Sequence, residues 1–103
     1  MSVIVVTKSN FEAEVLKSDV PVLADFNAGW CGPCRAMKPM LDELAEGNTA
    51  YKIVSIDIDE EDELADEYDV SSIPCLVVFK GGEEVNRSVG LIAKDAIAEL
   101  VEG

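Results

Sequence analysis

The sequence contains no histidine, and only three of its 103 residues are cysteines. A structural zinc site needs four Cys or His ligands at suitable spacing. The closely spaced pair Cys31 and Cys34 has only Cys75 as a further ligand of this kind. The composition therefore argues against a closed zinc site and favours another use for the paired thiols.

Positive charge is also scarce, because 8 Lys and Arg stand against 21 Asp and Glu, which gives a net charge of −13. Such a charge argues against nucleic acid and anionic membranes as partners, and it favours basic partner surfaces. Much of the acid lies in residues 57–69. We interpret this stretch as a solvated helix and loop rather than a calcium site, since the glycine and closing glutamate of an EF-hand loop are missing.

Long apolar runs are absent as well, and none approaches the ~20 residues that span a bilayer. Val3–Val6 is too short for the core of a signal peptide, so we expect a cytoplasmic protein. In that compartment a pair of cysteines with two residues between them is more often catalytic than structural. With 49% hydrophobic residues and no internal repeats, residues 1–103 are expected to form one globular domain.

The motif Trp-Cys-Gly-Pro-Cys at residues 30–34 carries the most chemical information. It lies between an apolar strand pattern and an amphipathic helix pattern that begins near Arg35. Unpaired N–H groups and partial positive charge at a helix N-terminus stabilise a thiolate, so the thiol pKa falls below its free value of about 8.5. We expect Cys31 at the exposed helix entrance and Cys34 about one turn later, within reach of a disulfide.

A purely structural disulfide is the alternative for this pair, although cross-linking so short a loop gains little stability. Pro33 fits the first turn of a helix, where its missing N–H is not needed. A pair of this spacing beside alternating strands and helices favours redox chemistry.

Hydrophobic periodicity predicts the order β-α-β-α-β-α-β-β-α, an α/β fold with a mixed central sheet of about five strands and about four flanking helices. The expected strands are Val3–Val6, Val22–Asn27, Tyr51–Ile58, Cys75–Lys80 and Glu84–Val89. The expected helices are residues 9–17, 35–46 with an internal Pro39, 61–68 and 93–102. Ser9 is predicted to cap the first helix, with Glu12 completing a capping box. The chemistry is expected at the carboxyl end of Val22–Asn27.

The chain resembles the thioredoxin family over essentially its whole length. The resemblance rests on the motif at residues 30–34, Asp25-Phe26 before it, Pro39 after it, Ile73-Pro74, the segment Phe79-Lys80-Gly81-Gly82, and Gly90. It implies the thioredoxin fold and a protein disulfide reductase. The redox group would be the Cys31/Cys34 pair itself, so no bound cofactor and no metal are implied.

The resemblance also implies a role for three residues. Cys31 would attack a substrate disulfide, and Cys34 would resolve the resulting mixed disulfide. Asp25 would be the buried carboxylate beneath the pair, where burial raises its pKa and lets it exchange protons near neutral pH. The implied partners are a thioredoxin reductase and disulfide-containing proteins, and a monomer is the default expectation.

A substrate-docking surface follows from the same resemblance. Pro74 is expected in the cis form, facing the dithiol, and the backbone of Ile73 is expected to pair with the substrate chain like an added strand. The expected docking residues are Trp30, Gly32, Pro33, Ile73, Pro74 and Gly90. Ordinary packing is the alternative for Trp30 and Ile73.

Three residues depart from the family pattern. Asn27 stands where the family usually has tryptophan, so the packing around the site and the pKa values of Asp25 and Cys34 do not follow from the resemblance. Ser55 replaces a frequent lysine, and losing that cation is expected to raise the pKa of Asp25 further. Cys75 replaces a frequent threonine, and we interpret it as a small buried hydrophobe rather than a third reactive thiol.

Two other functions remain open from the sequence. The first is a binding module that uses the fold without turnover, which the intact cysteine pair disfavours. The second is a thiol oxidase or isomerase, which the Gly-Pro spacer and the buried Asp25 disfavour.

Overall fold

The computed structural model describes residues 2–103, and Met1, the first residue of the expected domain, lies outside the described residues. Five strands form one sheet in the order β1-β3-β2-β4-β5. β3 pairs in parallel with both β1 and β2, whereas β4 pairs antiparallel with both β2 and β5. The strands are β1 (Ile4–Val5), β2 (Val22–Asn27), β3 (Lys52–Asp57), β4 (Cys75–Lys80) and β5 (Glu83–Val89). This arrangement confirms the predicted mixed sheet.

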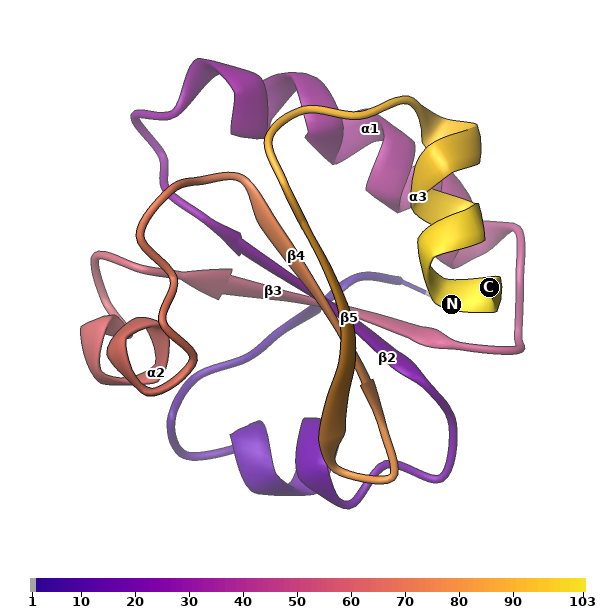
Figure 1. The fold of residues 1–103 in the computed structure, drawn as a ribbon, viewed down its shortest axis with the longest axis horizontal. Helices are drawn as coiled ribbons and strands as arrows, with labels where there is room; N and C mark the ends of the chain where they lie inside the picture. The colour runs from indigo at the N-terminus through magenta and orange to yellow at the C-terminus, as the bar shows by residue number, and fades with distance from the viewer. Residues whose placement is uncertain (1) are drawn as a thin grey trace.

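Four helical segments cover the sheet within residues 2–103. Helices α1 and α3 lie over one face, and the η1 and α2 segments lie over the other (Figure 1). Their bounds are η1 (Glu12–Leu16), α1 (Gly32–Glu46), α2 (Asp62–Glu67) and α3 (Lys94–Glu102). The sheet is therefore the middle of three layers, as the sequence predicts.

Strand β2 lies in the centre of the sheet and supplies both cores. Its side chains alternate between the two faces. Ala24 and Phe26 pack in the core beneath η1 and α2, and Leu23 packs in the core beneath α1 and α3. Asp25 and Asn27 follow Leu23 on its face, so the end of β2 places two polar side chains beneath α1.

The first helix differs from its prediction. Residues 12–16 form a single π-helical segment without a side-chain cap, and Ser9 Oγ instead contacts Thr7 Oγ1 at 2.9 Å. Asn10 Oδ1 accepts from Thr7 N at 2.7 Å, and Thr7 O accepts from Phe11 N at 3.0 Å. The capping box predicted at Ser9 is wrong, because these bonds begin the turn two residues earlier.

The predicted ends of the other elements agree with the structure or differ by one residue, apart from the start of α1. Helix α1 ends as predicted, where Gly47 N donates to Glu43 O at 2.9 Å. The hairpin between β4 and β5 turns through Gly81 and Gly82, whose φ angles are 61° and 81°. Both angles lie in the left-handed region that glycine adopts without strain.

Candidate active site

Cys31 is the N-cap of helix α1. Its backbone is extended, and its Sγ accepts a hydrogen bond from Cys34 N at 3.2 Å. This bond satisfies one of the N–H groups that a helix N-terminus leaves unpaired. The helix begins at Gly32, three residues before the predicted start, because Pro33 has a fixed φ that suits a first turn.

Cys31 and Cys34 form a disulfide, with their Cα atoms 5.2 Å apart. Their exposed fractions are only 5% and 6%, and they pack with Ala28, Ile58 and Ile73. The prediction that Cys31 is exposed is therefore wrong for this oxidised form. One turn of helix nonetheless brings the two sulfurs together, as the spacing predicts.

The surface around the disulfide contains an exposed aromatic ring. Trp30 is 68% exposed, and its indole Nε1 donates to Asp59 Oδ2 at 2.8 Å. Asp59 comes from the acidic stretch after β3, and sequence reasoning assigned it no contact with the site. The hydrogen bond holds one edge of the ring while leaving most of the indole open to solvent.

A second segment approaches the disulfide through Ile73, whose side chain packs against it. The Ile73–Pro74 peptide bond is cis, which confirms the expectation. Pro74 O accepts from Gly90 N at 2.8 Å, so the loop before β4 is joined to the end of β5. Gly32 and Pro33 are exposed, whereas Pro74 is buried and Gly90 is half-buried.

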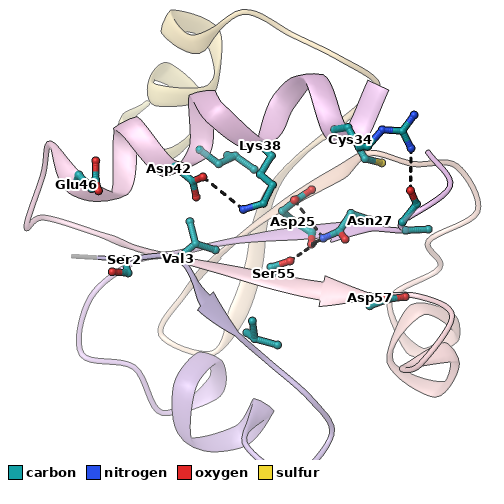
Figure 2. Close-up of a pocket in the computed structure, with 15 residues that line it drawn as sticks. Ser2, Val3, Asp25, Asn27, Cys34, Lys38, Asp42, Glu46, Ser55 and Asp57 are labelled. Atoms are coloured by element: carbon teal, nitrogen blue, oxygen red, sulfur yellow. Dashed lines mark hydrogen bonds and ion pairs between the residues drawn. The ribbon is translucent and has the colours of Figure 1, made fainter. Parts of the chain in front are cut away.

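Asp25 lies beneath the disulfide on β2 and is only 6% exposed. It lines a cavity of about 530 Å³ together with Cys34 and Lys38 from α1 (Figure 2). Within residues 2–103, its Oδ1 is a buried oxygen without a hydrogen-bond partner. The carboxyl of Asp25 and the second cysteine, Cys34, thus line one cavity.

Burial raises the pKa of Asp25 to about 7, against smaller opposing contributions from the Asn27 hydrogen bond and the positive charge of Lys38. A carboxyl with this pKa is divided between its two protonation states near neutral pH. Lys38 provides a cation from α1 although Ser55 occupies the position where the family often has lysine. The expectation that losing the lysine at position 55 raises the pKa of Asp25 further stays a prediction, and Lys38 acts in the opposite direction.

Asn27, one of the departures from the family pattern, bonds both to Asp25 and to Ser55, another of these departures. Asn27 Nδ2 donates to Ser55 Oγ at 2.8 Å, to Asp25 O at 2.9 Å and to Asp25 Oδ2 at 3.2 Å. The sequence contained part of this signal, since Asp25 and Asn27 are two residues apart on one strand. The position of Ser55 beside Asp25 required the register between β2 and β3.

Cys75 is not paired with either site cysteine. It is 1% exposed and belongs to the core on the opposite face of the sheet from α1. Burial raises the pKa of its thiol, and the nearby Arg87 opposes that effect. Its burial confirms the interpretation of Cys75 as a small core residue.

Across residues 2–103, no group of three or more His, Cys, Asp or Glu side chains is placed to hold a metal ion. The same residues include no helix that is both long and apolar enough to cross a membrane.

The disulfide at a helix N-terminus, the buried carboxyl beneath it and the mixed sheet that carries both define a thiol–disulfide oxidoreductase with the thioredoxin fold. The family model for thioredoxin matches residues 2–103. The chain belongs to the thioredoxin family.

Individual thioredoxins are similar in sequence to this chain over almost its whole length. A thioredoxin of Bacillus subtilis is 49% identical over 102 residues, covering 98% of this chain and 96% of the relative. Thioredoxin 1 of a Nostoc species is 46% identical over 98 residues, covering 94% and 92%. The solved structure of a mutant thioredoxin from Halobacterium salinarum has a TM-score of 0.88 at 41% identity, covering 98% of this chain and 88% of that one.

These similarities make the protein a protein-disulfide reductase whose redox group is the Cys31–Cys34 disulfide. The family implies two general kinds of partner, a reductase that supplies electrons and proteins that carry disulfides. A binding module without turnover and a thiol oxidase or isomerase are not favoured.

Proposed function

We propose that Cys31 is the attacking thiol and Cys34 the resolving thiol in the reduction of cytoplasmic protein disulfides. In the first step the Cys31 thiolate attacks one substrate sulfur, and the other substrate sulfur leaves as a thiolate. In the second step Cys34 attacks Cys31, so the mixed disulfide breaks and the Cys31–Cys34 disulfide forms. The two electrons of the dithiol thus pass to the substrate, which leaves with two thiols.

The assignment of Cys31 as the attacking thiol and Cys34 as the resolving thiol rests mainly on their positions at the N-terminus of α1. Cys31 is the N-cap, and its sulfur already accepts the Cys34 N–H at 3.2 Å. The same hydrogen bond and the partial charge of the helix N-terminus stabilise a thiolate at Cys31 in the reduced protein. Cys34 lies inside the first turn, within bonding reach of Cys31 and next to the cavity.

Asp25 accepts the proton that Cys34 loses before it attacks. Both residues line the same cavity, and burial brings the pKa of Asp25 to about 7. A group whose pKa lies near the operating pH transfers protons efficiently in both directions.

Substrate docks on the surface around the disulfide in this proposal. The exposed indole of Trp30 and the half-buried Ile73 provide apolar contacts, and the backbone of Ile73 pairs with an extended substrate chain. The proposed docking residues are Trp30, Gly32, Pro33, Ile73, Pro74 and Gly90. We further propose that residues 1–103 act as one monomeric domain that a thioredoxin reductase recharges.

A trapping experiment tests the order of attack. The Cys34→Ser variant, mixed with a protein disulfide substrate, is expected to accumulate a mixed disulfide on Cys31, which mass spectrometry locates. The Cys31→Ser variant is expected to form no such species. A Cys75→Ala variant is the control and is expected to complete turnover without trapping. A mixed disulfide found on Cys34 of the Cys31→Ser variant, at the rate seen for Cys34→Ser, would reverse the assignment.

A further inference from the structure

Three polar side chains converge at the carboxyl ends of β2 and β3. Asp25 and Asn27 are two residues apart on β2 and therefore project from the same face. Ser55 is the register partner of Asp25 on β3. The preceding pair on these strands, Leu23 and Ile53, is apolar and fully buried. All three polar side chains line the cavity that Cys34 also lines (Figure 2).

The amide of Asn27 is shared among three oxygens. Its Nδ2 donates to Ser55 Oγ at 2.8 Å, to the main-chain oxygen of Asp25 at 2.9 Å and to Asp25 Oδ2 at 3.2 Å. An amide NH₂ has two hydrogens, so at least one of them serves two acceptors. The bonds to Ser55 and to the main chain fix the direction of the amide, and the carboxylate receives a donor in a set position.

The two carboxylate oxygens of Asp25 consequently differ. Oδ2 has the Asn27 donor, whereas Oδ1 is buried without a hydrogen-bond partner in the described residues. A proton on Oδ2 would compete with the amide hydrogen for the same side of the oxygen. A proton on Oδ1 meets no such competitor. Figure 2 places the Asp25 carboxylate between Asn27 on one side and helix α1 on the other.

We propose that Asn27, held by Ser55, is a positioning residue that engages Oδ2 of Asp25 and leaves Oδ1 to receive the proton of Cys34. This inference rests on the role proposed above for Asp25, and it adds a reason for the asparagine and serine. The departing proton moves from Cys34 Sγ to Asp25 Oδ1, and the sulfur keeps the electron pair with which it attacks Cys31. Asn27 neither gains nor loses a proton.

Other charged and titratable groups surround Asp25 and remain unchanged in the variants below. Lys38 is the cation on α1 that stabilises the Asp25 carboxylate, and it also pairs with Asp42 at 3.4 Å. Cys75 on β4 interacts electrostatically with Asp25. The remaining groups that line the cavity from α1 and β3 are Cys34, Arg35, Asp42, Glu46 and Asp57.

The test is a titration of the Asp25 carboxyl carbon by NMR in the oxidised protein. The Asn27 hydrogen bond favours the charged carboxylate, so its loss in Asn27→Ala is expected to strengthen proton binding at Asp25 by about tenfold. The pH profile of disulfide reduction is expected to shift toward higher pH by a similar amount. Ser55→Ala removes the hydroxyl that holds the Asn27 amide, so it is expected to shift the Asp25 titration and the pH profile in the same direction but by less. If Asn27→Ala fails to fold, Ser55→Ala still tests the inference.

Two further variants separate this inference from the role of Asp25. Asn86 on β5, an exposed asparagine that donates to Leu100 O, gives the matched control Asn86→Ala, in which neither readout is expected to move. In an Asp25→Asn background, Asn27→Ala is expected to leave the pH profile unchanged. An Asp25 titration unaffected by both Asn27→Ala and Ser55→Ala overturns the inference alone. A wild-type pH profile in Asp25→Asn overturns the role of Asp25, and this inference with it.

Discussion

Asp25 is the residue at which burial of a carboxyl costs stability. Its pKa is about 7 in the folded protein, compared with an ordinary value of 3.8. Between these two values the folded chain binds more protons than the unfolded chain, so the free energy of unfolding falls as the pH rises. Above the folded pKa the carboxylate is charged in both states, and the full cost of burying it is present.

The Asp25→Asn variant is expected to be more stable than the wild type at pH 8, because it removes a buried charge. The difference of about three between the two pKa values corresponds to about 4 kcal/mol. The gain is expected to shrink as the pH falls through 7 and to vanish below about pH 4, where Asp25 is protonated in both states. Urea unfolding of the oxidised proteins across this range measures the difference. A gain independent of pH would contradict the assigned pKa.

Individual residues of the site were predictable to different degrees. The resemblance to the thioredoxin family predicted a buried Asp25 beneath the cysteine pair, and its burial is confirmed. Lys38 was not predictable in this way, since its charge reaches Asp25 only through the packing of α1 over β2. Asp59 was not predictable either, because its hydrogen bond to Trp30 joins residues 29 positions apart in the sequence.

The start of α1 and the hairpin between β4 and β5 are the elements that most directly position the site. The first brings Cys31 and Cys34 within bonding distance, and the second fixes β4, to which the loop containing Ile73 leads. The hairpin turn also contacts η1, because a Cβ at Gly82 would lie 2.8 Å from Leu16 O, a main-chain atom. The turn therefore depends on glycine at this position for space as well as for backbone angle.

Adjacent glycines in this turn provide a matched comparison. Gly81 has a φ of 61° with open space where a Cβ would lie, so Gly81→Ala is expected to cost about 1 kcal/mol of unfolding free energy from backbone strain. Gly82→Ala adds the clash with Leu16 O and is expected to cost about 3 kcal/mol. Urea unfolding of both variants gives the two costs. Equal losses would show that the contact with η1 is unimportant.

The predicted elements were most accurate where two independent signals agreed. β4 has its predicted bounds, since an apolar run is followed directly by Gly81-Gly82. The η1 segment was the weakest prediction, because both Thr7 and Ser9 are capping residue types and the sequence does not reveal which one bonds. The start of α1 was placed late because the capping role of the Cys31 sulfur is not part of the usual residue preferences.

At the scale of the whole molecule, the dominant feature is a net charge of −13 on 103 residues. Like charges repel within the compact state, and dissolved salt screens that repulsion. Few cations are available to offset it, and most of the ion pairs in the described residues lie at the exposed surface, where such pairs contribute little.

Added salt is therefore expected to stabilise the protein. Raising NaCl from about 0.01 M to about 1 M shortens the screening length from roughly 30 Å to roughly 3 Å, and the urea midpoint of unfolding is expected to rise with it. A variant with the exposed carboxylates Glu60 and Glu83 changed to Gln is expected to show a smaller response. A midpoint that stays constant or falls would contradict the view that self-repulsion limits stability.

The disulfide reductase activity tests the central claim most directly. Reduction of insulin with dithiothreitol as the regenerating thiol is measured for the wild type, Cys31→Ser and the control Cys75→Ala. The account predicts that Cys31→Ser reduces insulin no faster than dithiothreitol alone, because the attacking sulfur is gone, and that Cys75→Ala keeps wild-type activity. A Cys31→Ser variant as active as the wild type would contradict the account.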